Sequence, residues 1–267
     1  MVWSPFPLAD STRDRLWAVL SALLVAATGL GAGIGLVFGL SILLVLAGLE
    51  PSPFLVLVVS LVSIQGVAFG GVALGYLRFR GRSVRSVGLR VPSARDALLV
   101  VGGYAAAIVA AITGAIVVSA TGAPAGENQI SDLASADPSV LLWLVPASFL
   151  LIGPGEELLF RGVVQGRLRE TFDRVPGVVL ASALFAAVHY AALTGGTGGR
   201  LVTITILFFP ALVFGSVYEL TDNLVVPSLV HGAYNATLFA LAYAAIRLSE
   251  SGAIPEGETT QALVTLF

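Results

Sequence analysis

The 267-residue sequence contains no cysteine and no lysine, and it has only two histidines. The lack of cysteine excludes disulfides, thiolate nucleophiles and cysteine metal sites. Charged residues are also scarce, at 11% of the chain, whereas 57% of the residues are hydrophobic. Soluble domains do not have this balance, so the composition indicates a protein that crosses a membrane several times.

Long stretches without a charged residue mark the expected membrane spans. A bilayer core about 30 Å thick needs about 20 apolar residues per helix. Seven runs reach or approach this length: 16–49, 51–77, 97–126, 138–155, 175–199, 201–218 and 223–246. The first run is long, and the tail ends in an apolar piece at 262–267, which leaves room for an eighth helix. We therefore predict an all-α, polytopic transmembrane bundle of seven to eight helices, forming a single membrane domain over residues 1–267.

The arginines are unevenly distributed along the chain. Six of them lie in the loop at 78–95, whereas the segment at 121–139 holds three acidic residues and no arginine. Cytoplasmic loops of membrane proteins are enriched in basic residues. The distribution predicts an integral protein of the cell membrane with the 78–95 loop and the N-terminus in the cytoplasm. The first run is too long for a signal peptide, so we expect it to stay in the membrane.

A few polar residues lie within the apolar stretches, namely Glu156, Glu157, His189, His231 and Asn235. A charged side chain at membrane depth costs roughly 2.5 to 3.5 kcal/mol on insertion scales. Such residues persist mainly where they line a cavity or perform chemistry. Residues 139–248, which contain all of them, are therefore the expected catalytic helices.

The sequence GPGEE at 153–157 introduces proline and glycine into an otherwise apolar helix. Proline fits the first turn of a helix, so we expect a kink or a new helical start at this point. Glu157 and Arg161 are four residues apart and share a helix face, which allows an ion pair. Glu156 points about 100° away. This spacing predicts that Arg161 holds Glu157, while Glu156 is left free to react.

The two histidines lie on two further helices. His189 follows Phe185 by four residues, and small residues around this pair allow close helix packing. His231 and Asn235 are also four residues apart, so both project from one face of the last long helix. Taken singly, each of these polar residues is more typical of a hydrogen bond between helices than of catalysis.

Together, the polar residues offer complementary chemical roles. A glutamate can take a proton from water, and a histidine can hold that water or donate a proton to a leaving amine. An N–H group of histidine or asparagine can stabilise an oxyanion. The chain has no serine in a nucleophile-elbow pattern. Two histidines and a carboxylate also match a catalytic zinc site, but no His-Glu-x-x-His helix is present, so zinc would need ligands from three helices.

In their order along the chain, the motifs Glu-Glu-x-x-x-Arg, Phe-x-x-x-His and His-x-x-x-Asn resemble the CPBP family of intramembrane proteases. This family includes type II CAAX prenyl endopeptidases and bacteriocin-processing or self-immunity proteins. Weaker likenesses occur at 87–90 and 218–224.

The resemblance implies an eight-helix core, a metal-independent glutamate protease and a cavity that opens to the cytosol. It also implies that Glu156 activates water with help from His189. His231 and Asn235 would then form the oxyanion site, with Glu157 and Arg161 supporting the first motif.

We therefore expect an intramembrane endopeptidase that cleaves near the C-terminus of a peptide or lipidated protein, with a prenylated CAAX-type tail as one candidate. The expected partners are membrane lipids and this substrate, with no nucleic acid and no cofactor. A proton-coupled transporter is an alternative, although transporters often show internal repeats and paired broken helices, and this chain has no repeat. A non-catalytic binding or immunity protein of the same family is another alternative.

Overall fold

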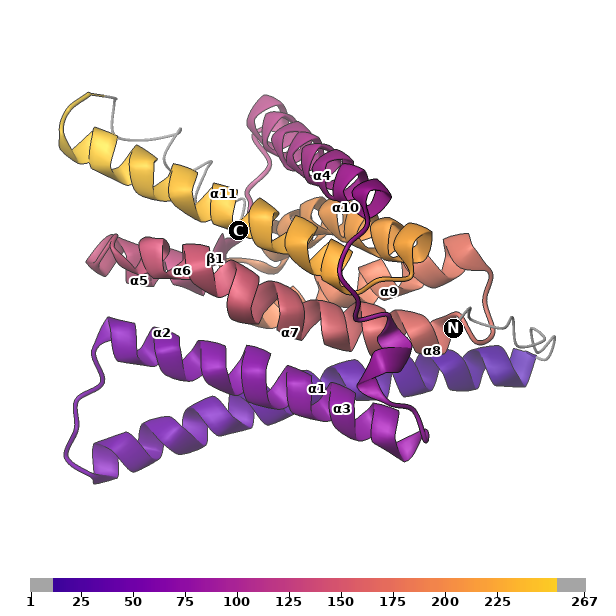
Figure 1. Ribbon diagram of the computed structural model, residues 1–267. Coiled ribbons are helices and arrows are strands. Elements are labelled where there is room, and N and C mark those ends of the chain that lie inside the picture. The colour runs from indigo at the N-terminus through magenta and orange to yellow at the C-terminus, as the bar shows by residue number, and fades with distance from the viewer. Residues whose placement is uncertain (1–11, 254–267) are drawn as a thin grey trace.

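The computed structural model describes residues 12–253, and within them seven helices are long and apolar enough to cross a membrane. Figure 1 shows that these helices form a bundle. The spans are α1 (Thr12–Leu46), α2–η1–α3 (Pro53–Phe79), α4 (Ala94–Thr121), α6–η3–α7–η4–α8 (Val140–Leu168), α9–η5 (Arg174–Ala192), α10 (Thr197–Thr221) and α11 (Val225–Glu250). The predicted all-α transmembrane bundle is confirmed. The chain is an integral membrane protein.

The long first run does not hide an additional crossing. It folds as one helix, α1, of 35 residues from Thr12 to Leu46. Glycines within α1 do not break it, because a helix tolerates isolated glycines at a cost of about 1 kcal/mol each. The apolar piece at 262–267, the other candidate for an eighth helix, lies outside the described residues.

The span from Val140 to Leu168 lies in the middle of the bundle (Figure 1). Helix α1 and the α2–η1–α3 span pack on one side of it, through contacts with η4 and α7. Helix α11 packs on the other side, and α4 and α10 lie beyond it. The middle span is consequently half buried within the protein, whereas α1 is mostly exposed to the surroundings of the bundle.

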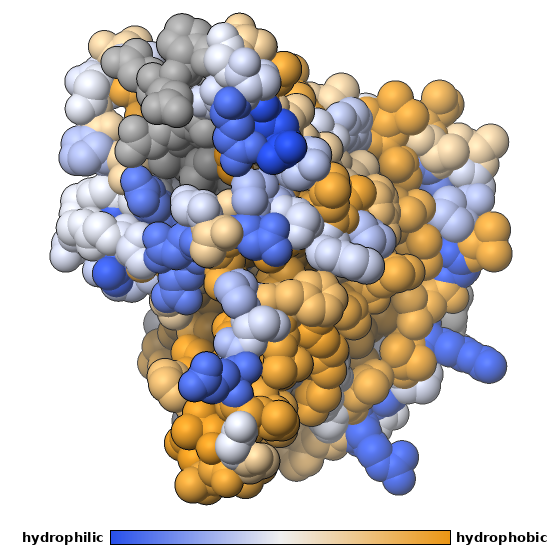
Figure 2. Space-filling model, turned by 90° about the vertical axis from the view of Figure 1, so that its left-hand side faces the viewer, coloured by the Kyte–Doolittle hydropathy of each residue, from blue (hydrophilic) through white to orange (hydrophobic). Residues whose placement is uncertain are grey.

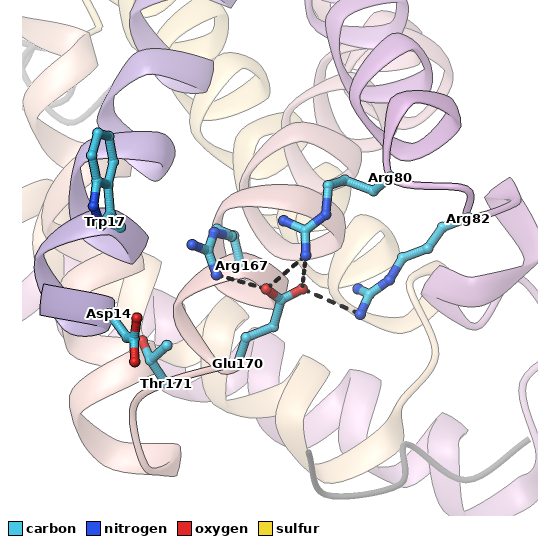
Figure 3. Close-up of a pocket in the computed structure, with 7 residues that line it drawn as sticks. All are labelled: Asp14, Trp17, Arg80, Arg82, Arg167, Glu170 and Thr171. Carbon is cyan, nitrogen blue, oxygen red and sulfur yellow. Dashed lines mark hydrogen bonds and ion pairs between the residues drawn. The ribbon is translucent and has the colours of Figure 1, made fainter. Parts of the chain in front are cut away.

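The bundle has two different ends. At one end, α8, the end of α3 and the start of α1 lie together, and Arg80, Arg82 and Arg167 converge on the carboxylate of Glu170 at 2.7 to 3.2 Å (Figure 3). We call this the arginine-rich end. At the other end, the two-residue strands β1 (Glu127–Asn128) and β2 (Leu193–Thr194) pair antiparallel beside the short helix α5 (Gln129–Ala136).

Two short segments that are distant in sequence meet at the arginine-rich end. The hydroxyl of Tyr218 donates to the carbonyl of Val87 at 3.3 Å, and the guanidinium of Arg90 donates to the carbonyl of Thr221 at 2.6 Å. Gly88, with φ of +76°, lies directly against the backbone of Asp222. The segments 87–90 and 218–224, which carry the weaker sequence likenesses, therefore form one contact that ties the arginine-rich loop to the turn between α10 and α11.

We expect Gly88→Ala to lower the unfolding temperature of the detergent-purified protein more than Gly81→Ala does. Both glycines have a left-handed backbone, which costs other residues roughly 1 to 2 kcal/mol. At Gly81 a new Cβ would have no atom within 4 Å, but at Gly88 it would overlap the Asp222 carbonyl. Thermal unfolding followed by circular dichroism measures the difference, and equal losses in the two variants would contradict the close contact.

Candidate active site

A cavity of about 640 Å³ lies between the first two spans and the helices that carry the polar motifs. Its wall includes all four residues predicted to be catalytic, Glu156, His189, His231 and Asn235, and also Phe185. These residues come from three separate spans. The polar residues therefore share one site, as their combination in the sequence suggested.

The helix that carries both glutamates does not break at the Gly-Pro-Gly segment. Its backbone stays in the right-handed helical region at Ile152 and Gly153, but the N–H of Gly153 bonds to the carbonyl of Ser148, five residues earlier. A π-helical stretch, η3 (Ser148–Ile152), precedes the short α7 (Gly153–Glu157). The expected kink or restart is thus a change of hydrogen-bond register, which accommodates the missing N–H of Pro154.

The two glycines of this segment let α7 approach neighbouring helices closely. A Cβ on Gly155 would overlap the carbonyl of Gln65 in η1 (Val62–Phe69). A Cβ on Gly153 would lie 2.8 Å from the carbonyl of Ser228 in α11. Glycine is therefore needed at both positions, because the contacts are with backbone atoms that cannot rotate away. This close packing brings η1, α7 and α11 together at the glutamates.

Glu157 is the buried centre of a polar network. One of its oxygens lies 2.9 Å from Nδ1 of His231, and the other lies 3.0 Å from Nε of Arg161. The ion pair with Arg161 is close, although its N–H is not aligned for a hydrogen bond. Glu157 and Arg161 are both fully buried. The predicted pairing of Glu157 with Arg161 is confirmed, and the carboxylate also orients the His231 ring.

Arg161 has two further contacts in the interior. Its Nη2 donates to the carbonyl of Ala211 in α10 at 3.3 Å, and its guanidinium carbon lies 4.8 Å from the ring centroid of Phe185. A buried guanidinium over an aromatic face gains a favourable cation–π interaction. Phe185, the first residue of the Phe-x-x-x-His motif, thus lies between Arg161 and the two histidines. Its ring centroid is 4.8 Å from that of His189 and 5.7 Å from that of His231.

Glu156 is buried at the cavity wall with 6% of its surface exposed. Its Oε1 accepts a hydrogen bond of 2.7 Å from the amide of Gln65, so the prediction that Glu156 stands free is wrong for this oxygen. Its Oε2 accepts no hydrogen bond from a described residue and lies 3.8 Å from Nε2 of His231. One carboxylate oxygen is therefore held by Gln65, while the other is buried without a hydrogen-bond partner among the described residues.

Gln65 was not predicted from the sequence, although a signal for it exists. It is the only amide or charged residue in the run from 51 to 77. The cost of a polar group at membrane depth, applied to the histidines, applies equally to this glutamine.

His189 lies at the end of α9 (Arg174–Val188), half-buried on the cavity wall. Its Nδ1 is 2.8 Å from the carbonyl of Phe185, to which a protonated Nδ1 donates. This contact favours the tautomer whose Nε2 can accept a proton. No hydrogen bond joins the described side chains of His189 and Glu156.

His231 and Asn235 lie one turn apart on α11, and both face the cavity. The ring of Phe214 stacks on His231 with centroids 4.6 Å apart and fixes the plane of the imidazole. Tyr234, also on the cavity wall, has a buried hydroxyl with no hydrogen-bond partner among the described residues.

Among residues 12–253, no group of three or more histidine or acidic side chains is arranged to hold a metal ion.

The cavity and the arginine-rich end lie at opposite ends of the bundle. The cavity reaches β1 and α5 through Asn128, Gln129 and Leu133, and none of its lining residues comes from 70–127. The resemblance implied a cavity open to the cytosol, whereas the arginine distribution predicts that the opposite end faces the cytosol. The geometry does not allow both expectations to hold.

Comparison with protein-family models identifies the region that contains this site. Residues 138–237 match the model described as type II CAAX prenyl endopeptidase Rce1-like. The chain has an Rce1-like region. The resemblance deduced from the motifs is thereby confirmed, and the Rce1-like region contains every residue predicted for the site. It excludes Gln65, which reaches the site from outside the match. Searches of curated proteins and of solved structures returned no match.

The Rce1-like match also supports a hydrolase at the level of the family, because the family is one of endopeptidases. It covers the four consecutive spans from Val140 to the middle of α11. Helices α1 to α4 lie outside the match, although α1 and α2 form part of the cavity wall.

We expect Arg161→Met to destabilise the protein by about 3 to 5 kcal/mol, because it leaves the Glu157 carboxylate buried without its cation. The double variant Arg161→Met/Glu157→Gln removes both charges and should recover part of this loss. Thermal unfolding of the purified variants measures both effects. If the single variant were as stable as the parent protein, the ion pair would not be needed to bury Glu157.

Proposed function

We propose that the protein is an intramembrane endopeptidase in which Glu156 activates the water that attacks a peptide bond. The main support for this proposal is the environment of the Glu156 carboxylate. One oxygen is held by Gln65, and the other is buried at the cavity wall without a hydrogen-bond partner among the described residues. A general base needs such an oxygen within reach of the proton that it removes.

His189 would assist Glu156 at the same water. With Nδ1 donating to the Phe185 carbonyl, its Nε2 can accept one hydrogen of the water while Glu156 accepts the other. Two acceptors on one water orient its oxygen lone pair toward the substrate carbonyl. This arrangement supplies the positioning that makes an attack within the site faster than one in solution.

His231 and Asn235 would stabilise the oxyanion of the tetrahedral intermediate. The Asn235 amide can donate an N–H from the cavity wall, one helical turn from His231. The His231 Nδ1 is already engaged with Glu157, so donation to the oxyanion requires a second proton on Nε2. Glu157 is thus a positioning residue, since it holds the imidazole in place and lies beyond reach of the cavity.

Glu156 both receives and returns the proton that is transferred in the reaction. Its carboxylate takes a proton as the water oxygen bonds to the carbonyl carbon, which gives the tetrahedral intermediate. When the C–N bond breaks, the protonated Glu156 returns this proton to the leaving amine. The products are a carboxylic acid and an amine, and Glu156 is again ionised for the next cycle.

The cavity wall suggests the kind of substrate. Opposite the polar residues, it is lined by apolar side chains from α1, α2 and η1, among them Leu30, Ile34, Leu61 and Ile64. A volume of about 640 Å³ is in the range of pockets that enclose small ligands or several side chains. We propose a peptide with an apolar or lipid-modified C-terminal part as the substrate. A prenylated CAAX-type tail is the candidate that the family match favours.

Glu156→Gln should abolish cleavage of a prenylated CAAX reporter peptide by the purified protein, with a loss of 10²-fold or more in kcat, because the amide cannot take a proton. Glutamine keeps an oxygen for the Gln65 amide, so the unfolding temperature should change little. The matched control is Glu250→Gln at the exposed end of α11, which should leave cleavage unchanged. Full activity of Glu156→Gln would refute the assignment of the base.

Metal removal separates the glutamate mechanism from the zinc alternative. After treatment with a strong chelator and dialysis, we expect the protein to cleave the reporter at its original rate, since Glu156 supplies the base. The metal content of the treated protein, measured by mass spectrometry, checks that removal is complete. Loss of cleavage that returns on adding zinc would show that the carboxylate and histidines are metal ligands.

A further inference from the structure

The floor of the cavity is closed toward the arginine-rich end. Three aromatic rings at its base meet edge to face, with centroids 6.0 Å apart for Phe69 and Phe160 and 5.1 Å apart for Phe160 and Phe185. Beneath them, Leu159 and Val163 continue a buried apolar core toward α8. Within residues 12–253, a packed apolar core therefore separates Glu156 from the arginine-rich end.

The opposite end of the cavity is framed by polar and exposed residues. Asn128 and Gln129 line it at the junction of β1 and α5, and Gln129 is exposed. Phe38, in the C-terminal half of α1, also lines it and is 66% exposed. Figure 2 views the molecule from this end, where hydrophobic surface covers the lower part, over α1 and α2, and more hydrophilic surface lies above. We call this opening the α5 mouth.

The basic residues define which side of the membrane each end occupies. Arg200 and Arg247 lie at the end of the bundle that holds the α5 mouth, and Arg161 is buried within the membrane span. Successive spans run in opposite directions, so the remaining arginines all lie at the arginine-rich end. These are Arg13, Arg15, Arg78, Arg80, Arg82, Arg85, Arg90, Arg95, Arg167, Arg169 and Arg174. An asymmetry this large fixes the orientation of a membrane protein, with the basic end in the cytoplasm.

We infer that the substrate enters the cavity from the extracytoplasmic side of the membrane, through the α5 mouth. The inference rests on the proposed function for the identity of the substrate, but the orientation of the mouth is independent of it. The substrate class is then an extended segment of a membrane-anchored or exported protein that reaches the site from the outer leaflet, in place of a prenylated CAAX-type tail presented from the cytosol. Its apolar part would lie along α1 and α2, with the scissile bond at Glu156.

The absence of cysteine in the natural sequence makes the orientation directly testable. Single cysteines are introduced at Ser135, exposed on α5, and at Ser86, exposed in the arginine-rich loop. Intact cells that express each variant are treated with a membrane-impermeant maleimide. We expect Ser135→Cys to be labelled in intact cells and Ser86→Cys only after lysis. Labelling of Ser86→Cys in intact cells, alone or together with Ser135→Cys, would overturn the inference.

A second experiment tests entry through the α5 mouth. Gln129→Cys lines the cavity, whereas Ser135→Cys on the same helix does not. Modification by a bulky maleimide should lower reporter cleavage at least tenfold in purified Gln129→Cys and leave Ser135→Cys unchanged. Equal rates before and after modification of Gln129→Cys would contradict entry at this mouth. If neither unmodified variant nor the parent protein cleaved any reporter, the proposed function would fail while the labelling result still decided the orientation.

Discussion

The structure depends on the burial of the Glu157 carboxylate in the middle of an apolar bundle. A charge in this environment is tolerated only when it is paired, because its desolvation costs several kcal/mol. Both oxygens of Glu157 are in contact with partners, Arg161 on the same helix and His231 on α11. Arg161 in turn reaches the Ala211 carbonyl on α10. One buried charge thus joins three spans, and the same contacts fix the ring of a candidate catalytic histidine.

Close approach of backbones makes this network possible. Gly153 and Gly155 let α7 contact the backbones of α11 and η1, where side chains would keep the helices apart. The π-helical register around α7 accommodates a proline without breaking the span. Small residues at helix contacts are the general means by which membrane helices approach each other. In this protein the close approach at Gly155 brings the Gln65 amide to within 2.7 Å of the Glu156 carboxylate.

The positions of the spans and the identity of the polar set could be predicted from the sequence. Charge-free runs locate membrane helices because charge is costly inside the bilayer. The fourth span is the exception, since it continues beyond the run at 138–155 to Leu168 with Glu156, Glu157 and Arg161 buried inside it. The pairing of Glu157 with Arg161 followed from helical spacing alone. The contact of Gln65 with Glu156 and the contact of Glu157 with His231 could not be predicted in this way. They join residues on different helices that are 91 and 74 positions apart in the sequence. No local periodicity encodes which faces of distant helices meet.

Composition and spacing were enough to predict a membrane protein of seven to eight helices with its arginines concentrated toward one side. They were also enough to select a carboxylate, two histidines and an asparagine, all of which lie in the Rce1-like region. Those properties depend on composition and on spacing within single helices. The folded bundle was needed to see that Gln65 holds Glu156, that Glu157 orients His231, and that the cavity opens away from the arginines. These features arise from how helices pack against one another, and packing depends on side-chain shape across the whole bundle.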